Sequence, residues 1–175
     1  MNEKIYVAKL GKTVGLNGTM KVYIDSDFPE QFKKNAKFIT QKNKQLTVEN
    51  FNSNNSTVKF LDINSVEDAK KLTNSHLFSS IEATKQNCKL KKDQYFWFDL
   101  IGCDIIENNE ILGKIIDIQR LPLDDYFVIE TTKELQQKDL TKQFLIPYTK
   151  QYIQSVDIAN KKIIVTNAKD ILEAS

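Results

Sequence analysis

The sequence predicts an all-β protein that consists of two small β-barrels with short helices. The main observation is a series of short segments rich in strand-forming residues, spaced by roughly 8–12 residues and separated by turn-forming residues. A second observation is a polar, lysine-rich stretch at residues 85–93, near the middle of the 175-residue chain, which is typical of a linker. The predicted domains are therefore residues 1–84 and 94–175, and no sequence repeat relates them.

The first half contains six candidate strands. The segment Gly18–Ile24 alternates apolar and polar residues, with Met20, Val22 and Ile24 on one face, which is the period of a half-buried strand. Residues 52–55, Asn-Ser-Asn-Asn, predict a hairpin turn. The other candidate strands are Ile5–Leu10, Lys37–Thr40, Gln45–Phe51, Ser56–Leu61 and Leu77–Ile81.

Two short helices interrupt these strands. The segment Phe28–Phe32 predicts one helix, with Asp27 as its cap. The segment Ser65–Leu72 predicts the other, because Ser65 followed by Asp68 approximates a capping box.

The second half continues the strand pattern and ends in a helical turn at Ala168–Ala174. Turns are predicted at Asn108–Asn109 and at residues 157–161. The candidate strands are Asp104–Glu107, Glu110–Ile118, Tyr126–Glu130, Phe144–Pro147 and Lys162–Val165.

The charge is divided unequally along the chain. Residues 1–92 hold 16 lysines and nine acidic residues, a net charge of +7, whereas residues 93–175 hold nine basic and 14 acidic residues, a net charge of −5. Opposite charges on two domains favour two partners of opposite sign. A polyanion such as RNA suits the first half, and a basic protein suits the second. Because Arg120 is the only arginine, we expect attraction to the RNA backbone rather than base readout.

No set of residues in the sequence predicts catalysis, a metal or a cofactor. His76 is the only histidine, and Cys88 and Cys103 lie far apart, so we expect buried free thiols rather than a zinc site or a disulfide. Asp124 and Asp125 are interpreted as solvated residues of a turn. No segment has the length of a membrane span or the pattern of a signal peptide, so a cytoplasmic monomer without a membrane partner is expected.

A glycine- and lysine-rich segment lies near the start of the chain, at residues 9–21. Glycine permits positive φ angles, so the glycines predict a turn between two strands, and the lysines could contact phosphate groups or remain solvated. The loop glycines are Gly11, Gly15 and Gly18, and the candidate RNA-contacting lysines are Lys9, Lys12 and Lys21.

A run of aromatic residues, Tyr95-Phe-Trp-Phe, follows the predicted linker and leads to Gly102, which is expected at a backbone turn. In an extended segment Tyr95 and Trp97 would face one way, and Phe96 and Phe98 the other. One pair would then belong to the core, and the other would form either a domain interface or a partner site. The pattern does not say which pair does which.

Several of these segments resemble the bacterial ribosome maturation factor RimM family. Residues 7–22, Val-Ala-Lys-Leu-Gly-Lys-Thr-Val-Gly-Leu-Asn-Gly-Thr-Met-Lys-Val, are similar to its N-terminal signature, and residues 67–77 are similar to its Ala-x-x-Leu helix. Residues 95–102, Tyr-Phe-Trp-Phe-Asp-Leu-Ile-Gly, resemble the start of its second domain, a PRC-barrel. The C-terminal pattern, Leu145-Ile-Pro followed by Ile163-Ile-Val, also matches. In contrast to the family, Val14 replaces a frequent histidine, and Phe96 replaces the second tyrosine of a Tyr-Tyr pair.

The resemblance implies a fold, a function and a set of contacts. The first domain would be a six-stranded barrel of the OB-like or translation-factor-like type. The protein would be a non-enzymatic factor that binds the head of the immature small (30S) ribosomal subunit and assists 16S rRNA processing. It would bind the head protein numbered nineteen through Tyr95 and Phe96. The alternatives are a PRC-barrel adapter that does not act on ribosomes, and an rRNA-processing enzyme.

Overall fold

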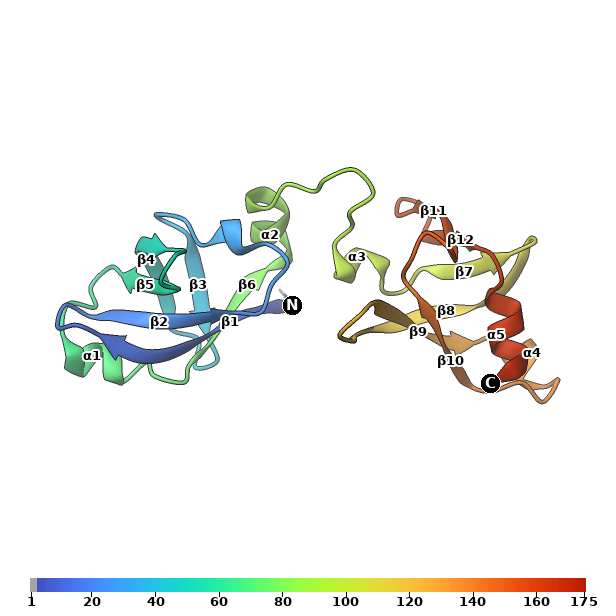
Figure 1. Cartoon of the computed structure of the whole chain (residues 1–175), viewed down its shortest axis with the longest axis horizontal. Coiled ribbons are helices and arrows are strands. Elements are labelled where there is room, and N and C mark those ends of the chain that lie inside the picture. Colours follow the sequence, from blue (N-terminus) through green and yellow to red (C-terminus); the bar gives the residue numbers. More distant parts are fainter. Residues whose placement is uncertain (1–2) are drawn as a thin grey trace. The chain divides into compact units, whose positions relative to one another are not determined.

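The computed structural model describes residues 3–175. The chain divides into two compact units, with the boundary between Lys89 and Leu90 (Figure 1). Strands dominate both units, so the predicted all-β class is confirmed. The boundary between the units falls within residues 85–93, the stretch that the sequence predicts as a linker. The first residues of that stretch nevertheless belong to a helix, α2 (Ile81–Asn87).

The first unit is a closed six-stranded barrel with the strand order β1-β2-β5-β4-β3-β6. The predicted strands are all present, and the alternation of β2 holds, with Met20 and Val22 buried. The first predicted strand is longer than expected, because β1 continues through Gly11 to Val14. The strands are β1 (Lys4–Val14), β2 (Thr19–Ile24), β3 (Lys37–Thr40), β4 (Gln45–Asn52), β5 (Thr57–Phe60) and β6 (His76–Ser80).

Large apolar side chains fill this barrel. Leu10, Met20, Phe38, Phe60 and Leu77 are all fully buried. Burial of each such side chain contributes about 1.5–3 kcal/mol relative to exposure. In β2 and β3 buried residues alternate with more exposed ones, so in these strands the barrel's outer face follows the same sequence pattern as its core.

Short helices connect the barrel strands. At α1 (Val66–Lys70) the hydroxyl of Ser65 accepts a hydrogen bond from the Asp68 N–H at 3.1 Å, which confirms the predicted cap. The other predicted helix is a single 3₁₀ turn, η1 (Pro29–Gln31), and its cap position is Phe28 rather than Asp27. The prediction of Asp27 was wrong because the proline, which favours the first helical position, sets the start one residue later.

A third helix in this unit, α2 (Ile81–Asn87), was not expected from the sequence. The hydroxyl of Ser80 accepts a hydrogen bond from the Ala83 N–H at 3.1 Å, which caps the helix at its start. The segment carries no apolar stripe long enough to show helical periodicity, and its polar residues Lys85, Gln86 and Asn87 made it resemble a linker.

The second unit is a six-stranded sheet with the strand order β10-β9-β8-β7-β12-β11. Neighbouring strands are antiparallel except β7 and β12, which run parallel. The strands are β7 (Asp104–Glu107), β8 (Glu110–Arg120), β9 (Asp125–Thr131), β10 (Gln143–Pro147), β11 (Ile153–Asp157) and β12 (Lys162–Val165). The bounds of β7 and β12 match their predictions, and the predicted turn at Asn108–Asn109 has positive φ at both residues.

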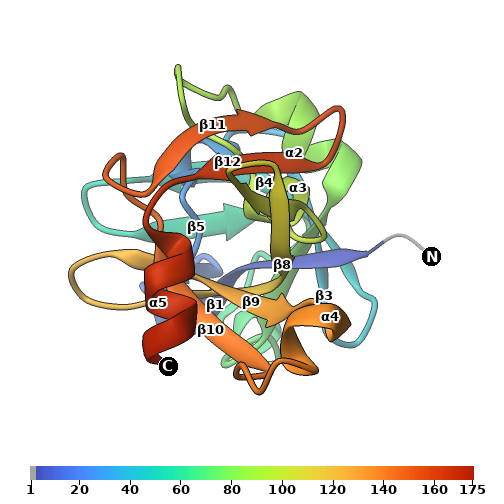
Figure 2. The same cartoon turned by 90° about the vertical axis from the view of Figure 1, so that its right-hand side faces the viewer.

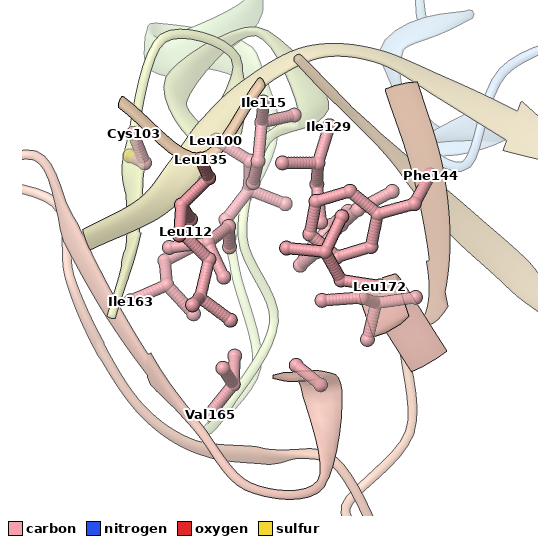
Figure 3. Close-up of a cluster of buried hydrophobic side chains, with 14 residues drawn as sticks. Leu100, Cys103, Leu112, Ile115, Ile129, Leu135, Phe144, Ile163, Val165 and Leu172 are labelled. Carbon is pink, nitrogen blue, oxygen red and sulfur yellow. The ribbon is translucent and has the colours of Figure 1, made fainter. Parts of the chain in front are cut away.

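The sheet curls around a single apolar core, which Figure 3 shows in close-up. Leu112, Ile115, Ile129 and Ile163 lie within this core, and each is at most 1% exposed. The C-terminal helix α5 (Ala168–Ala174) packs beside β10, where Leu172 completes the core (Figure 2). Within residues 3–175 the order of paired strands begins at β10 and ends at β11, so hydrogen bonds do not close this sheet.

A carboxylate from the sheet fixes the start of α5. Glu107, at the end of β7, accepts hydrogen bonds from the backbone N–H groups of Asn167 and Lys169, both at 2.7 Å. Asn167 itself sits in the left-handed region with φ of 57° and makes no side-chain cap. The predicted helical turn is therefore confirmed, and Glu107 satisfies its first N–H groups.

Three elements of the second unit were not expected. The four-residue helices α3 (Trp97–Leu100) and α4 (Lys133–Gln136) are too short to produce a periodic pattern. Strand β11 was missed because its sequence, Ile-Gln-Ser-Val-Asp, is mostly polar and its apolar residues are only half-buried.

Candidate protein-binding and RNA-binding surfaces

The glycine-rich segment forms a tight turn between β1 and β2. Gly15 and Gly18 have φ angles of +70° and +86°, as expected of turn glycines. At Gly18 a side chain is also excluded by space, because a Cβ atom would lie 2.0 Å from the carbonyl oxygen of Ile63. A strand, β2, follows this segment, whereas a helix follows the phosphate-binding loop of nucleotide-binding proteins, so the segment is not such a loop.

Gly11 is not a loop residue, which corrects the prediction from the sequence. It lies inside β1, and a Cβ atom there would be 2.7 Å from Cε2 of Tyr23 and 3.0 Å from Cβ of Lys21. Gly11 therefore makes room for the side chain of Tyr23 rather than forming a turn.

Gly102 does occupy a turn, as predicted. Its φ angle is +83°, and no atom lies within 4 Å of a Cβ atom placed there. Its N–H donates to the carbonyl of Ile115 at 2.8 Å, which ties the turn before β7 to the neighbouring strand β8.

The three candidate lysines lie on the β1–β2 hairpin of the first unit. Lys9 is directly opposite Tyr23 in the β1–β2 register, and Lys21 is two residues before Tyr23 on β2. Lys12 is exposed, whereas Lys9 and Lys21 are partly buried. The ammonium group of Lys21 donates to the backbone carbonyl of Asn55 at 2.5 Å. The hairpin therefore brings Lys9 and Lys21 to one face, with a tyrosine between them.

The aromatic run in the second unit is not the extended segment that the prediction assumed, because it enters helix α3. Tyr95 and Phe96 precede α3, and the rings of Trp97 and Phe98 belong to the helix itself. Phe96 is buried and stacks on Phe98 with ring centroids 5.0 Å apart, whereas Trp97 is 39% exposed and Tyr95 is half-buried. Phe96 and Phe98 therefore lie together, as the alternation paired them, although the segment is helical rather than extended.

A groove of about 680 Å³ lies beside Tyr95, within the second unit. It is lined by Asp93 and Tyr95, by the segment after β10, and by β11, specifically Tyr148, Thr149, Lys150, Ile153, Gln154, Ser155 and Val156. The groove therefore lies between the two ends of the open sheet. The sequence did not indicate it, because β11 was not predicted.

The ring of Tyr148 forms a fixed wall of this groove. It stacks on the core residue Phe127 with ring centroids 4.7 Å apart. Burial, together with the smaller effects of Tyr95 and of the carboxylates of Asp125 and Asp93, raises the pKa of Tyr148 to about 12. The groove therefore combines aromatic surface with charges of both signs, since Asp93 and Lys150 both line it and Asp125 acts on the neighbouring Tyr148.

Nothing in the described part of the chain assembles a metal-binding cluster. Residues 3–175 contain no group of three His, Cys, Asp or Glu side chains placed to hold a metal ion. Cys88 and Cys103 are free and buried, and burial raises the pKa of both thiols, that of Cys88 to about 11. His76 packs against the ring of Tyr6, edge to face, at 5.5 Å. Within the described residues, 3–175, no helix has the length and apolar character of a membrane span.

Two family models together match most of the chain. The RimM N-terminal domain matches residues 5–84, and the RimM PRC barrel domain matches residues 97–171. The two matched ranges correspond to the closed barrel and to the open sheet.

Curated relatives match the chain over its whole length. Proteins named ribosome maturation factor RimM from Aliarcobacter butzleri and Nitratiruptor sp. are 54% and 48% identical over 100% and 99% of this chain, and over 99% of their own length in each case. A crystal structure of a RimM protein from Pseudomonas aeruginosa covers 96% of this chain and 99% of its own, at 19% identity and a TM-score of 0.43. The chain belongs to the RimM family of ribosome maturation factors.

Proposed function

We propose that this chain is a non-enzymatic maturation factor that binds the immature small ribosomal subunit and assists 16S rRNA processing. In this proposal the second unit binds the head protein numbered nineteen, and the first unit contacts rRNA. The observation that carries the proposal is the groove beside Tyr95, with its aromatic wall and its neighbouring carboxylates. Membership of the family and the names of the relatives support it.

Tyr95 and Phe96 have different roles in this proposal. Tyr95 lines the groove and is half-buried, so its ring and hydroxyl can contact the partner. Phe96 is 5% exposed and stacks on Phe98, so it acts mainly by holding Tyr95 and α3 in position. A basic side chain of the partner would lie against the aromatic rings and near Asp93 and Asp125.

The test is binding of the purified protein to the purified head protein, measured by calorimetry. We expect Tyr95→Ala to weaken binding about tenfold or more, because truncation of an aromatic anchor commonly costs that much. We expect Tyr95→Ala/Phe96→Ala to weaken it further. Trp97→Ala is the matched control, since Trp97 is an exposed aromatic neighbour that does not line the groove.

Circular dichroism of each variant separates loss of the site from loss of the fold. Full binding by a folded Tyr95→Ala variant would move the interface away from the groove. Absence of binding by the wild-type protein would contradict the ribosomal function and favour an adapter role.

The proposed rRNA contact has its own test. Lys9, Lys12 and Lys21 would attract phosphate groups, so binding of a small-subunit rRNA fragment should weaken as salt is added. Replacing all three lysines with alanine should reduce the slope of log affinity against log salt by about 2, at about 0.7 for each phosphate contact to single-stranded RNA. Affinity that is insensitive to salt would contradict this part of the proposal.

A further inference from the structure

Tyr23 is an exposed aromatic residue on the outer face of the first barrel. Its side chain is 60% exposed, although it belongs to β2, whose neighbouring residue Val22 is buried in the core. An exposed ring on a strand usually packs against side chains across the sheet. Here the cross-strand neighbours are a lysine, Lys9, and a glycine, Gly11.

The ring of Tyr23 lies over the backbone of Gly11. A Cβ atom at Gly11 would be 2.7 Å from Cε2 and 3.3 Å from Cζ of Tyr23. Any residue other than glycine at this position of β1 would displace the ring. The glycine therefore allows the ring to rest on the strand, while much of the side chain remains accessible to solvent.

Two lysines neighbour this ring in the sheet. Lys9 is the direct cross-strand partner of Tyr23, and Lys21 is on the same face of β2, two residues away. Figure 1 shows β1 and β2 running side by side along the first unit. A groove of about 570 Å³, lined by residues 21–24 of β2 and by Ser56, begins beside the ring.

From this arrangement we infer that Tyr23 is a stacking platform for an unpaired nucleobase of single-stranded RNA. A base stacks on the exposed part of the ring, while Lys9 and Lys21 contact the flanking phosphates. Stacking on an aromatic ring next to basic residues is the usual way in which proteins bind single-stranded nucleic acid without reading its sequence. The inference rests on the proposed rRNA contact of the first unit and adds that the RNA there is unpaired.

The test uses the full chain and two fluorescein-labelled RNA probes, an eight-nucleotide oligoadenylate and an oligomer of equal length with abasic sites. Fluorescence anisotropy reports the affinity for each probe. We expect the wild-type protein to bind the intact RNA more tightly than the abasic RNA, because only the former can stack.

The variants separate the ring from the charge. Tyr23→Leu should weaken binding of the intact RNA about fivefold or more and leave abasic RNA unchanged, since leucine covers Gly11 without offering an aromatic face. Tyr23→Phe should retain the wild-type preference. Lys9→Ala should weaken binding of both probes. Leu16→Ala is the control, because Leu16 is an 86% exposed residue of the adjacent turn.

Equal binding of the two probes by the wild-type protein, or unchanged binding of intact RNA by a folded Tyr23→Leu variant, would overturn the inference. A Tyr23→Leu variant that loses head-protein binding instead would show that this face binds protein. Binding of the head protein, measured in parallel, is expected to be the same in all Tyr23 variants. Failure of that binding in the wild type would affect the proposed function and not the platform.

Discussion

The two units use strands in different ways. The first closes its six strands into a barrel and exposes only side chains, with lysines and Tyr23 on its β1–β2 face. The second leaves its sheet open, and the groove beside Tyr95 lies between the ends of that sheet. A closed barrel has no free strand edge, so its binding surface is a set of outward-facing residues, whereas an open sheet provides a concave surface of its own.

The largest expected effect concerns the first unit. Gly18→Ala should lower the free energy of unfolding by roughly 3 kcal/mol, because the new Cβ would meet the carbonyl of Ile63 and the backbone has a positive φ. Gly15→Ala should cost only about 1 kcal/mol, since the φ angle is positive but the space is free. Urea unfolding followed by circular dichroism measures both changes.

The same variants test whether the two units unfold independently. Trp97 is the only tryptophan in the sequence and lies in the second unit, so its fluorescence reports that unit. We expect the fluorescence transition of Gly18→Ala to remain where it is in the wild type. A shift as large as that seen by circular dichroism would show that the two units unfold together.

A smaller effect is expected at the junction of β7 and α5 in the second unit. Glu107→Gln should lower the free energy of unfolding by about 1–3 kcal/mol. The two carboxylate oxygens of Glu107 accept from Asn167 and Lys169, whereas an amide has one oxygen acceptor and no charge. Urea unfolding followed by Trp97 fluorescence measures the loss. Glu130→Gln, an exposed change on β9, is the control, and an equal effect of the two variants would contradict a capping role.

The smallest effect concerns the buried thiol of Cys88 in the first unit. Folding raises the pKa of Cys88 from 9.0 to about 11, so the thiol keeps its proton in the folded state after the unfolded chain has lost it. The contribution of this thiol to the free energy of unfolding is therefore fully present below about pH 9 and is lost as the pH rises toward 11. The loss is no more than about 1.4 kcal/mol for each pH unit. Unfolding of the wild type and of Cys88→Ala between pH 8 and 11 should show a shallower decline in the variant. Equal slopes would contradict the raised pKa.

The sequence predicted those parts of the fold that have a regular pattern. The alternation in β2, the capping serine Ser65 and the asparagine turn before β8 each have a local cause, and each was confirmed. Helix α3 and strand β11 were missed because four or five residues of mixed polarity carry no periodic signal. Their structure depends on packing against distant parts of the chain.

The candidate sites show the same limit. Gly11 was expected in a loop, since nothing local reveals that the ring of Tyr23 lies over it. Phe96 was expected beside Tyr95 at a partner site, and the structure instead buries its ring against Phe98. The wall formed by Tyr148 depends on the stacking of that residue on Phe127, which belongs to another strand. An outward position on β2 was the one signal that could have identified Tyr23.

The parallel pair of β7 and β12 has a consequence for synthesis of the protein. Asp104 pairs with Lys162, and all four remaining strands of the second unit, β8 to β11, lie between them in the sequence. Contacts between residues so distant in sequence form slowly and only after the intervening chain is present. The closed barrel can therefore fold while the chain is still being translated, whereas the second sheet must wait until β12 has left the ribosome.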